Sequence, residues 1–369
     1  MKTIAIVGST GSIGETSLKV ISKNKKKFKL IFLSAHRNYK KLIAQSKKYN
    51  PKNIFLTNEK FYKKIKSRKL IKVKNIFNNS NKIDYVISGA SGYDALDLNI
   101  KLLKISKKLL IANKETIICG GDIFLNLAKK NNCKIIPIDS EHHCIDFFMN
   151  NFLQKKEIIK KIYLIASGGP FYEKQIKYNE KIKNVIKHPV WSMGKTISVN
   201  SSNFSNKVLE MFEAKILFNL PPEKIDILVE RKSMVHAIIQ LENNIFFPIV
   251  HYPKMEIAIS NSLKIQFNEN KNLDNISLNF SKPKNNKFPL VHLGHKILKK
   301  YSNSGMIIFT VFNERLVDLY LAKKIMYGDI VANLVKLFNK KTIIAKSKIK
   351  INSIKDIKSI LNFAKNYKL

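Results

Sequence analysis

The sequence predicts an α/β protein with a parallel sheet in its N-terminal part, a central α+β domain and a C-terminal α-helical domain. Three observations predict this organisation. Short apolar runs alternate with helical patterns in the first half of the chain, a glycine-rich turn follows the first apolar run, and helical patterns follow a polar stretch near residue 270. Such alternation is typical of parallel strands, because each crossover between them needs a long connection that is usually a helix.

Apolar runs bounded by turn residues indicate the strands, and apolar residues at three- and four-residue spacing indicate the helices. In the N-terminal half, strands are expected at 4–7, 30–35, 53–56, 85–88, 109–112 and 134–138, with helices at 15–22, 95–105 and 116–129 between them. The central part is expected to hold strands at 162–166, 225–229 and 237–241 and a helix from 205. The predicted domains are 1–139, 140–264 and 290–369, with a linker at 265–289.

The strong positive charge of the chain does not by itself indicate a nucleic-acid partner. Lysine and arginine number 67 against 26 acidic residues, which gives a net charge of +41. Only four of the basic residues are arginine, although arginine is the preferred side chain for reading bases and gripping phosphates. The lysines are spread along the whole sequence. We interpret the charge as a compositional bias and expect no physiological nucleic-acid partner, only salt-sensitive polyanion binding.

Cysteine content and hydropathy predict a reduced, soluble, cytoplasmic protein. The three cysteines form no CxxC pair, so neither a disulfide framework nor a thiolate metal site is expected. No apolar run approaches the roughly 20 residues that span a bilayer, and the apolar run at the start is shorter than a signal-peptide core of about 7–15 residues. No membrane association is therefore expected.

The first motif, IAIVGSTGSIGETSL, places Gly8, Gly11 and Gly14 between a strand and a helix. Backbone amides at such a turn and the positive end of the helix hold a pyrophosphate, although a glycine turn can also be purely structural. The second strand ends in LSAHRN, with Arg37 and no acidic residue for a ribose hydroxyl. A cation there suits a 2′-phosphate, so the sequence favours a Rossmann-like domain that binds NADP over one that binds NAD. The alternative is that Arg37 is a solvated charge.

Two carboxylates, Asp139 and Glu141, stand at the end of a predicted strand in IIPIDSEHH. Residues two apart on an extended chain share one face, so both carboxylates could converge on one hard divalent cation such as Mg²⁺ or Mn²⁺. Adjacent residues rarely converge on one ion, which argues against a zinc site at His142 and His143. The alternative is a solvated strand end.

Two further motifs place polar groups that could hold an anionic substrate. In NKVLE, Asn206, Lys207 and Glu210 fall on one face of the predicted helix, where Glu210 could reach the metal or form a surface ion pair with Lys207. In LIASGGPF, a strand ends in Ser167 and two glycines. Such a turn can wrap a phosphate with a hydroxyl and backbone amides, or be an ordinary turn.

Together these residues resemble a known family, 1-deoxy-D-xylulose 5-phosphate reductoisomerase. The matching strings, in the family's order, are GSTGSIG (8–14), LIANKET (110–116), PIDSEHH (137–143), SGGPF (167–171), HPVWSMGKTISV (188–199) and NKVLE (206–210). Weaker matches at 233–236, 253–255 and 313–314 extend the resemblance along nearly the whole chain. Six ordered motifs are far more specific than any one of them.

The resemblance implies roles for individual residues. It implies that a divalent metal, Mg²⁺ or Mn²⁺ with Co²⁺ as a third candidate, is bound by Asp139, Glu141 and Glu210. It implies that NADPH is bound by Gly8, Ser9, Thr10, Gly11, Ser12, Ile13, Gly14, Arg37, Asn38, Asn113, Glu115, Met193 and Gly194. It implies that the substrate contacts Lys114, Ser140, Glu141, Ser167, His188, Trp191, Ser201, Asn206, Lys207 and Glu210, with Lys114, Asp139, Glu141, His188 and Glu210 as the catalytic set.

The implied reaction rearranges and reduces 1-deoxy-D-xylulose 5-phosphate to 2-C-methyl-D-erythritol 4-phosphate in non-mevalonate isoprenoid biosynthesis. The segment 185–195 resembles the family's mobile flap, and a homodimer is implied. The alternatives are another NADP-dependent dehydrogenase that shares only the glycine turn, and a polyanion-binding protein that has lost catalysis.

Several positions depart from the family pattern. They are Val190, Asn200, Val208, Glu256 and the segment VERKSMVH at 229–236, which lacks the usual His-Pro pair. None removes an expected metal ligand or phosphate contact. We therefore expect an active enzyme of marginal stability.

Overall fold

The computed structural model describes residues 1–369 except 78–80, 154–157, 192, 269–276 and 285. The chain divides into two compact units. Unit 1 consists of 1–113, 124–143 and 254–270, and unit 2 consists of 114–123, 144–253 and 271–369. Part of the expected linker at 265–289 lies outside the described residues. The sequence-based domain boundaries stay a prediction.

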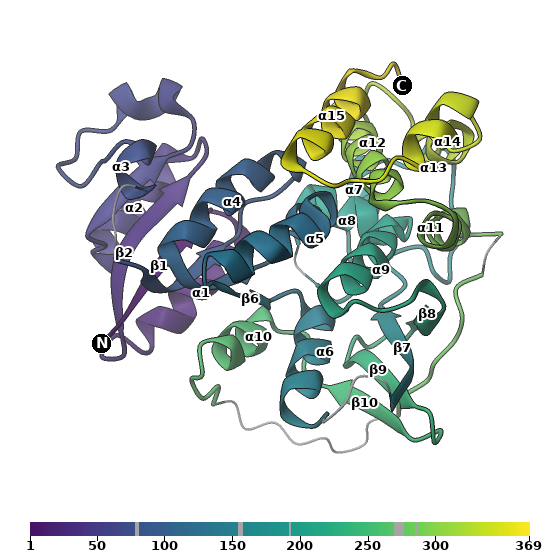
Figure 1. Ribbon diagram of the computed structural model, residues 1–369, viewed down its shortest axis with the longest axis horizontal. Helices are drawn as coiled ribbons and strands as arrows, with labels where there is room; N and C mark the ends of the chain where they lie inside the picture. Colours follow the sequence, from purple (N-terminus) through teal and green to yellow (C-terminus); the bar gives the residue numbers. More distant parts are fainter. Residues whose placement is uncertain (78–80, 154–157, 192, 269–276, 285) are drawn as a thin grey trace. The chain divides into compact units, whose positions relative to one another are not determined.

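Unit 1 is built on a parallel sheet, whose strands run from purple to blue in Figure 1. In the described chain its strands are β1 (Lys2–Val7), β2 (Phe28–Ala35), β3 (Asn53–Leu56), β4 (Ile83–Ser88), β5 (Ser106–Ile111) and β6 (Lys134–Pro137). Their order is β3-β2-β1-β4-β5-β6, and neighbouring strands are parallel. The strand order reverses between β1 and β4, and open α/β sheets bind ligands at the carboxyl ends of the strands at such a point. The predicted Rossmann-like sheet is confirmed.

Helices cover this sheet because their apolar faces pack on its isoleucine- and leucine-rich strands. They are α1 (Ser12–Ser22), α2 (Tyr39–Tyr49), α3 (Val73–Phe77), α4 (Leu96–Ile105), the second part of α5 (Lys114–Lys130) and α10 (Met255–Ser262), with 3-10 turns at Glu59–Lys64 and Tyr93–Ala95. Helix α10 is distant in sequence but packs on α1, where Ile259 and Leu263 join Leu18 and Ile21 in one buried cluster. The segment 254–270 therefore completes the core of unit 1.

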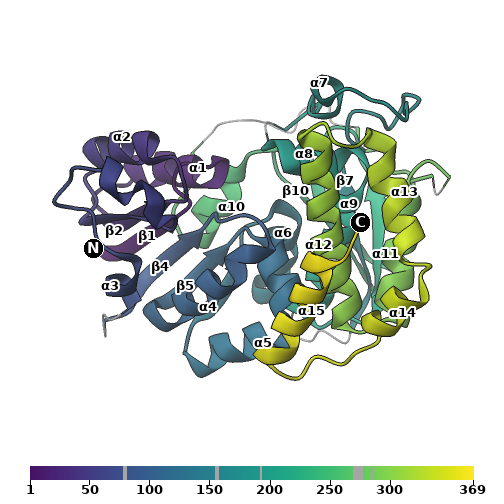
Figure 2. The same cartoon turned by 90° about the horizontal axis from the view of Figure 1, so that it is seen from above.

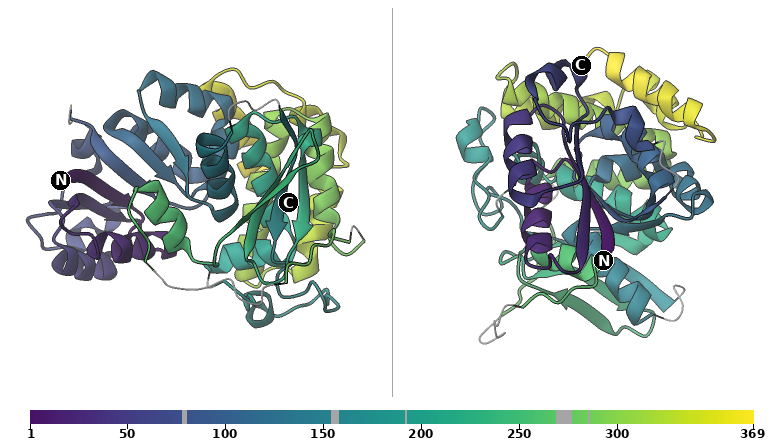
Figure 3. Two further views of the ribbon diagram at one scale, coloured as in Figure 1. Left: turned by 90° about the horizontal axis from the view of Figure 1, so that it is seen from below. Right: turned by 90° about the vertical axis from the view of Figure 1, so that its left-hand side faces the viewer.

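Unit 2 contains a mixed sheet, visible on the right of the left-hand view in Figure 3. Its strands are β7 (Ile159–Ala166), β8 (Ile225–Val229), β9 (Val235–Leu241) and β10 (Phe246–Val250), in the order β10-β9-β7-β8. β7 pairs parallel with β8 and antiparallel with β9. β10 was not expected from the sequence, and it is an edge strand that contains Pro248, a residue that edges tolerate because proline donates no ladder hydrogen bond.

The remaining helices belong to unit 2, apart from the first turn of α6. They are α6 (Ser140–Asn151), α7 (Ile182–Val185), α8 (Lys195–Ser202), α9 (Ser205–Phe218), α11 (Pro289–Lys300), α12 (Asn303–Leu321), α13 (Tyr327–Leu337), α14 (Lys341–Ser347) and α15 (Ile354–Asn366), with a 3-10 turn at Pro222–Lys224. Figure 2 shows α11, α12 and α13 side by side, and α9 packs on β7 and β8. Among the described residues, none of the helices has the length and the apolar composition needed to cross a membrane.

The contact between α9 and α11 explains one departure from the family pattern. Val208 is fully buried, and a Cβ added at Gly294 would lie 2.8 Å from Val208 Cγ1 and 3.0 Å from Cγ2. Valine is stiff at χ1 and cannot swing aside easily. The absent side chain of Gly294 therefore provides the room that Val208 occupies.

We predict that Gly294→Ala lowers the free energy of unfolding by about 1–3 kcal/mol through overpacking, partly offset by about 1 kcal/mol of helix propensity. In a Val208→Ala background the same change should cost nothing or stabilise, because the clash is gone. Urea unfolding of the four proteins in the double-mutant cycle measures the coupling. Additive effects would contradict this account of the contact.

Candidate active site

The turn after β1 is a tight glycine turn that leads into α1. Gly8 has φ of 73°, and a Cβ there would lie 2.8 Å from the carbonyl carbon of Gly89. A Cβ on Gly14 would lie 2.4 Å from the Cα of Ser9, so both positions require glycine. Gly11 is the N-cap of α1 and is exposed, and as a glycine it has no side chain that could cap the first helical turn. The amides of this first helical turn can therefore receive an anion.

The other expected cofactor residues of unit 1 lie near the carboxyl ends of its strands. His36, Arg37 and Asn38 follow β2 and are exposed, and Asn38 caps α2 by accepting from Lys41 N at 3.2 Å. Asn113 follows β5, is 2% exposed and donates to Gly92 O at 3.2 Å. The hydroxyl of Ser9 is buried and bonds Gln45 Oε1 at 2.7 Å, while Thr10, Ser12 and Ile13 complete the turn.

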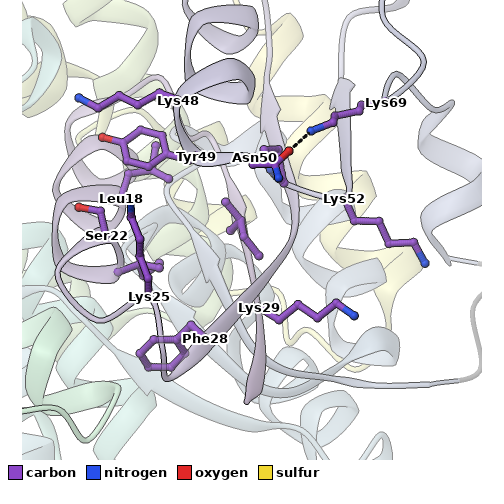
Figure 4. A pocket seen from close by; sticks show the side chains of 13 residues that line it. Leu18, Ser22, Lys25, Phe28, Lys29, Lys48, Tyr49, Asn50, Lys52 and Lys69 are labelled. Atoms are coloured by element: carbon purple, nitrogen blue, oxygen red, sulfur yellow. Dashed lines mark hydrogen bonds between the residues drawn. The ribbon is translucent and has the colours of Figure 1, made fainter.

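A cavity of about 560 Å³ in unit 1 lies elsewhere (Figure 4). It is lined by Phe28, Lys29 and Leu30 at the start of β2, by Pro51 and Lys52 just before β3, and by the ends of α1 and α2. These are the amino ends of the strands, opposite the glycine turn. Because parallel sheets build their sites at the carboxyl ends, we do not assign this cavity to the cofactor.

Asp139 and Glu141 follow β6 at the beginning of α6. The expectation of an extended chain here is wrong, because helix α6 begins at Ser140 and Asp139 O already accepts from His143 N at 2.7 Å. Hydrogen bonds to neighbouring side chains position the two carboxylates, and the alternation of an extended strand does not. Asp139 Oδ1 lies 2.9 Å from His142 Nδ1, and Ser140 Oγ donates to Glu141 Oε2 at 2.5 Å. The histidine thus orients a carboxylate, as histidine-carboxylate contacts do around metal ligands.

In unit 2, the start of α5 and the start of α9 form a buried charged cluster. Glu210, 1% exposed, lies 2.5 Å from Lys207 Nζ through Oε2 and 3.5 Å from Lys114 Nζ through Oε1. Lys114 Nζ also donates to Asn206 Oδ1 at 3.1 Å, and the Asn206 amide donates to Glu210 Oε1. Two ammonium groups offset the cost of burying the carboxylate. The surface ion pair considered above is excluded by this burial.

The turn after β7 brings Ser167 beside the expected flap. Gly168 and Gly169 have φ of 82° and 64°, and a Cβ on Gly169 would lie 2.8 Å from Ser201 O at the end of α8. Ser167 Oγ lies 2.8 Å from His188 Nε2 and accepts from Gly169 N at 3.3 Å. Lys207 Nζ donates to Ile165 O at 2.8 Å, just before the turn. A hydroxyl and a buried ammonium therefore flank the turn.

The state of His188 follows from its contacts. Its Nδ1 accepts from Val190 N at 3.2 Å and from Trp191 N at 2.9 Å, so the proton of a neutral ring is on Nε2. Burial, with the charges of Arg231 and Lys207, lowers the pKa of His188 to about 4. At neutral pH the ring is uncharged, and Nε2–H donates to Ser167 Oγ.

The remaining residues of the expected flap lie beyond His188. The ring centroid of Trp191 lies 6.0 Å from that of His236, which in turn stacks at 3.8 Å on His251. Met193 is half-buried, Gly194 is the exposed N-cap of α8, and Ser192 lies outside the described residues. Glu115 is half-buried in the first turn of α5.

Two residues that contact the Ser167 turn or Trp191 were not assigned a role from the sequence. Arg231 donates to carbonyls of the Ser167 turn, and His236 contacts Trp191. The signal for Arg231 was present, since it is one of four arginines in a lysine-rich chain.

Comparisons with known proteins show the family to which the chain belongs. Family models match at 4–121 (1-deoxy-D-xylulose 5-phosphate reductoisomerase), 135–218 (its C-terminal domain) and 251–367 (DXP reductoisomerase C-terminal domain). The enzyme of this name from Pelagibacter ubique is 41% identical over 363 residues, covering 92% of this chain and 91% of the relative. The one from Ehrlichia canis is 37% identical and covers 90% of each chain.

Solved structures give the same result. A DOX-P reductoisomerase in complex with NADPH, fosmidomycin and magnesium has a TM-score of 0.90 at 26% identity, covering 99% of this chain and 97% of that one. The Zymomonas mobilis 1-deoxy-D-xylulose 5-phosphate reductoisomerase in complex with NADPH, at 24% identity and a TM-score of 0.85, shares the fold and covers 99% and 97%. The chain belongs to the 1-deoxy-D-xylulose 5-phosphate reductoisomerase family.

Proposed function

We propose that this chain catalyses the NADPH- and divalent-metal-dependent rearrangement and reduction of 1-deoxy-D-xylulose 5-phosphate to 2-C-methyl-D-erythritol 4-phosphate. The observation that carries the proposal is the buried cluster of Lys114, Asn206, Lys207 and Glu210, in a chain 41% identical to a reductoisomerase over most of its length. Burying charges in this way is costly, and functional sites are where such groups are kept.

The residues present fit a hard metal ion and a dinucleotide. Asp139 and Glu141 of unit 1 and Glu210 of unit 2 offer only carboxylate oxygens, the donors that Mg²⁺ and Mn²⁺ prefer. The Gly8 turn leads into the amino end of α1, whose backbone amides would bind a pyrophosphate, and Arg37 after β2 would pair with a 2′-phosphate. When bound, the cation supplies Lewis acidity toward the substrate's carbonyl and hydroxyl oxygens, and NADPH supplies hydride.

The chain's own residues then act through charge and position. Lys114 Nζ, fixed by Asn206 and Glu210, presents a cation or a proton to an oxygen that becomes negative as the carbon skeleton rearranges. Ser140, at the start of α6, would contact a substrate oxygen. Closure of Trp191 over the substrate would exclude water from the reactive aldehyde.

The phosphate of the substrate would be held at a distance from the reacting carbons. We assign it to Ser167, Ser201, Asn206 and Lys207. Ser201 and Lys207 lie beside the turn after β7 that contains Ser167, and Asn206 precedes Lys207 on α9. Both lone pairs of Ser167 Oγ accept, from Gly169 N and from neutral His188, so its own proton is directed outward as a donor. Binding energy from this remote group fixes the orientation of the substrate.

We predict that Arg37→Ala raises KM for NADPH about 10-fold and leaves KM for NADH unchanged. The guanidinium would pair with a 2′-phosphate that only NADPH carries, and a solvated ion pair is worth about 1 kcal/mol or somewhat more. Initial rates with each nucleotide measure the split. Lys40→Ala, which removes an exposed charge three residues along, is the control. Equal losses with both nucleotides would assign Arg37 no role in selectivity.

The proposed reaction is tested by isotope transfer. NADPH deuterated at C4 of the nicotinamide is incubated with the protein, Mg²⁺ and 1-deoxy-D-xylulose 5-phosphate, and the product is examined by mass spectrometry and NMR. We expect one deuterium per molecule, on the carbon reduced from the aldehyde. A labelled product with an unrearranged skeleton would instead indicate a simple ketose reductase.

Three further expectations belong to this proposal. A homodimer is supported by the family resemblance alone, and light scattering of the purified protein tests it. The absence of a physiological nucleic-acid partner is supported by the scarcity of arginine. The cytoplasmic location stays a prediction.

A further inference from the structure

The side chain of Arg231 lies against the turn that follows β7. Nη1 donates to Ser167 O and, at 3.1 Å, to Gly169 O. The guanidinium carbon lies 5.5 Å from the ring centroid of Tyr172, and Nε lies 3.4 Å from Glu173 Oε1. Glu173 is 71% exposed, so this ion pair contributes little. The two carbonyls and the aromatic face are the contacts that hold Arg231.

The sheet explains why Arg231 reaches this turn. β7 and β8 are parallel neighbours with Ala166 paired to Val229, so the residues that follow both strands leave the sheet at one edge. Glu230 N extends the ladder by donating to Ala166 O at 3.0 Å. Glu230 also closes its own turn, since its carboxylate accepts from Lys232 N at 2.7 Å and Met234 N at 2.9 Å. Arg231 is thus presented by a backbone fixed on both sides.

The contact determines which groups of the turn face away from the guanidinium. In a trans peptide the C=O and N–H point in opposite directions, so a Ser167 carbonyl directed at Arg231 turns Gly168 N–H to the other side. Gly168 is tightly confined, because a Cβ there would lie 2.7 Å from the Tyr172 ring and 2.9 Å from Arg231 Nη1. Arg231 therefore fixes the backbone of Ser167 and of Gly169, the residues on either side of Gly168.

We propose that Arg231 is a positioning residue for the substrate's phosphate group: it holds the Ser167–Gly169 turn in its anion-binding conformation and adds a positive charge behind it. Arginine suits this role because its Nη1 group donates to both carbonyls while the guanidinium carbon lies 5.5 Å from the Tyr172 ring centroid. A planar guanidinium stacks on an aromatic face in a way that a compact ammonium group does not. A fixed cation near a partly buried anion site raises its affinity for a phosphate dianion. The inference rests on the proposed function.

The same charge acts on the flap. After burial, the largest cause of the low pKa of His188 is the charge of Arg231, followed by that of Lys207. A neutral His188 is what donates to Ser167 Oγ. Arg231 therefore supports the Ser167 hydroxyl from two directions, through the backbone of the turn and through the protonation state of the ring.

The experiment compares Arg231→Gln, Arg231→Lys and the control Lys232→Gln with the unchanged protein. Lys232 is exposed and bonds Ser277, so its replacement removes a charge one residue away without touching the turn. We expect Arg231→Gln to raise KM for the phosphorylated substrate and Ki for inorganic phosphate by the same factor, about 10-fold. Values of kcat and of KM for NADPH should change less than 3-fold, and Arg231→Lys should restore part of the loss.

Separate readouts distinguish the possible failures. If the unchanged protein does not convert the substrate, the proposed function is overturned. The Kd for inorganic phosphate, measured by calorimetry, still reports on the turn in that case, and an equal Kd for Arg231→Gln would overturn the inference. If the unchanged protein is active and Arg231→Gln keeps its phosphate affinity, the inference is overturned. A general loss, with kcat and both KM values changed and a lower unfolding temperature, would assign Arg231 a structural role only.

Discussion

Replacing Glu210 by Gln should lower kcat/KM at least 100-fold and raise the Mg²⁺ concentration needed for half-maximal activity. The carboxylate would lose its charge as a metal ligand, and Lys114 and Lys207 would lose the anion that compensates them. Breaking a buried ion pair on one side costs about 3–5 kcal/mol, so a lower unfolding temperature is also expected. Steady-state rates over a Mg²⁺ titration, with thermal unfolding of the same samples, measure both effects.

Glu213→Gln is the matched control for this variant. Glu213 lies on the same helix and is equally buried, at 1% exposure. It should share a loss of stability but not the shift in Mg²⁺ dependence. Full activity of Glu210→Gln at unchanged Mg²⁺ would rule out Glu210 as a metal ligand.

Replacing Lys207 by Met should lower kcat/KM about 100-fold or more, chiefly through KM for the phosphorylated substrate. The ammonium group bonds Ile165 O just before the Ser167 turn and lies 2.5 Å from Glu210. Its loss removes a cation that would bind the phosphate, and it leaves the buried Glu210 carboxylate with one fewer partner. Truncating one partner of a buried charge pair costs about 2–5 kcal/mol. Initial rates as a function of each substrate measure the change.

Lys215→Met tests whether charge alone explains this loss. Lys215 lies two turns further along α9 and is half-buried, and burial lowers its pKa. The same substitution there removes one positive charge from the helix but none from the phosphate turn. Similar rises in KM for both variants would show that Lys207 acts only through the overall charge of the chain.

The N-terminal fold could be predicted because local pattern and tertiary structure agree there. The apolar run ending at Val7, the glycine turn and the helical pattern at 15–22 each indicate the same β-turn-α unit, and β1 and α1 form at this place. Gly8 and Gly14 are required by backbone contacts between neighbouring segments, which a glycine at a strand-helix junction already suggests. Consistency between levels makes such segments legible in a single sequence.

The segment after β6 could not be read correctly from local pattern. IIPIDSEHH contains an apolar run followed by charged residues, which fits a strand end, and nothing in that pattern shows that the helix begins at Ser140. The Asp139 carbonyl accepts a backbone hydrogen bond from His143 N, and the Asp139 side chain contacts that of His142 within the same first turn. The roles of these residues stay a prediction, whereas the extended local geometry expected for them is wrong.

Other features depend on partners distant in sequence and have no local signature. Val208 was a departure from the family pattern, and its explanation is the missing side chain of Gly294 on another helix. Asn200, a second departure, accepts from Ser205 Oγ at 2.9 Å and from Asn313 Nδ2 at 3.1 Å, so it serves a buried polar network. Arg231 shows the same limit, because its role follows from the pairing of β7 with β8.

The central claim is that this chain is an NADPH- and metal-dependent reductoisomerase, and one measurement tests it most directly. Purified protein is mixed with NADPH, Mg²⁺ and 1-deoxy-D-xylulose 5-phosphate, and the loss of reduced-nicotinamide absorbance is followed, with NADH and a chelator as controls. We predict a loss that requires NADPH and the metal and that yields 2-C-methyl-D-erythritol 4-phosphate. No loss from folded, NADPH-bound protein would contradict the account.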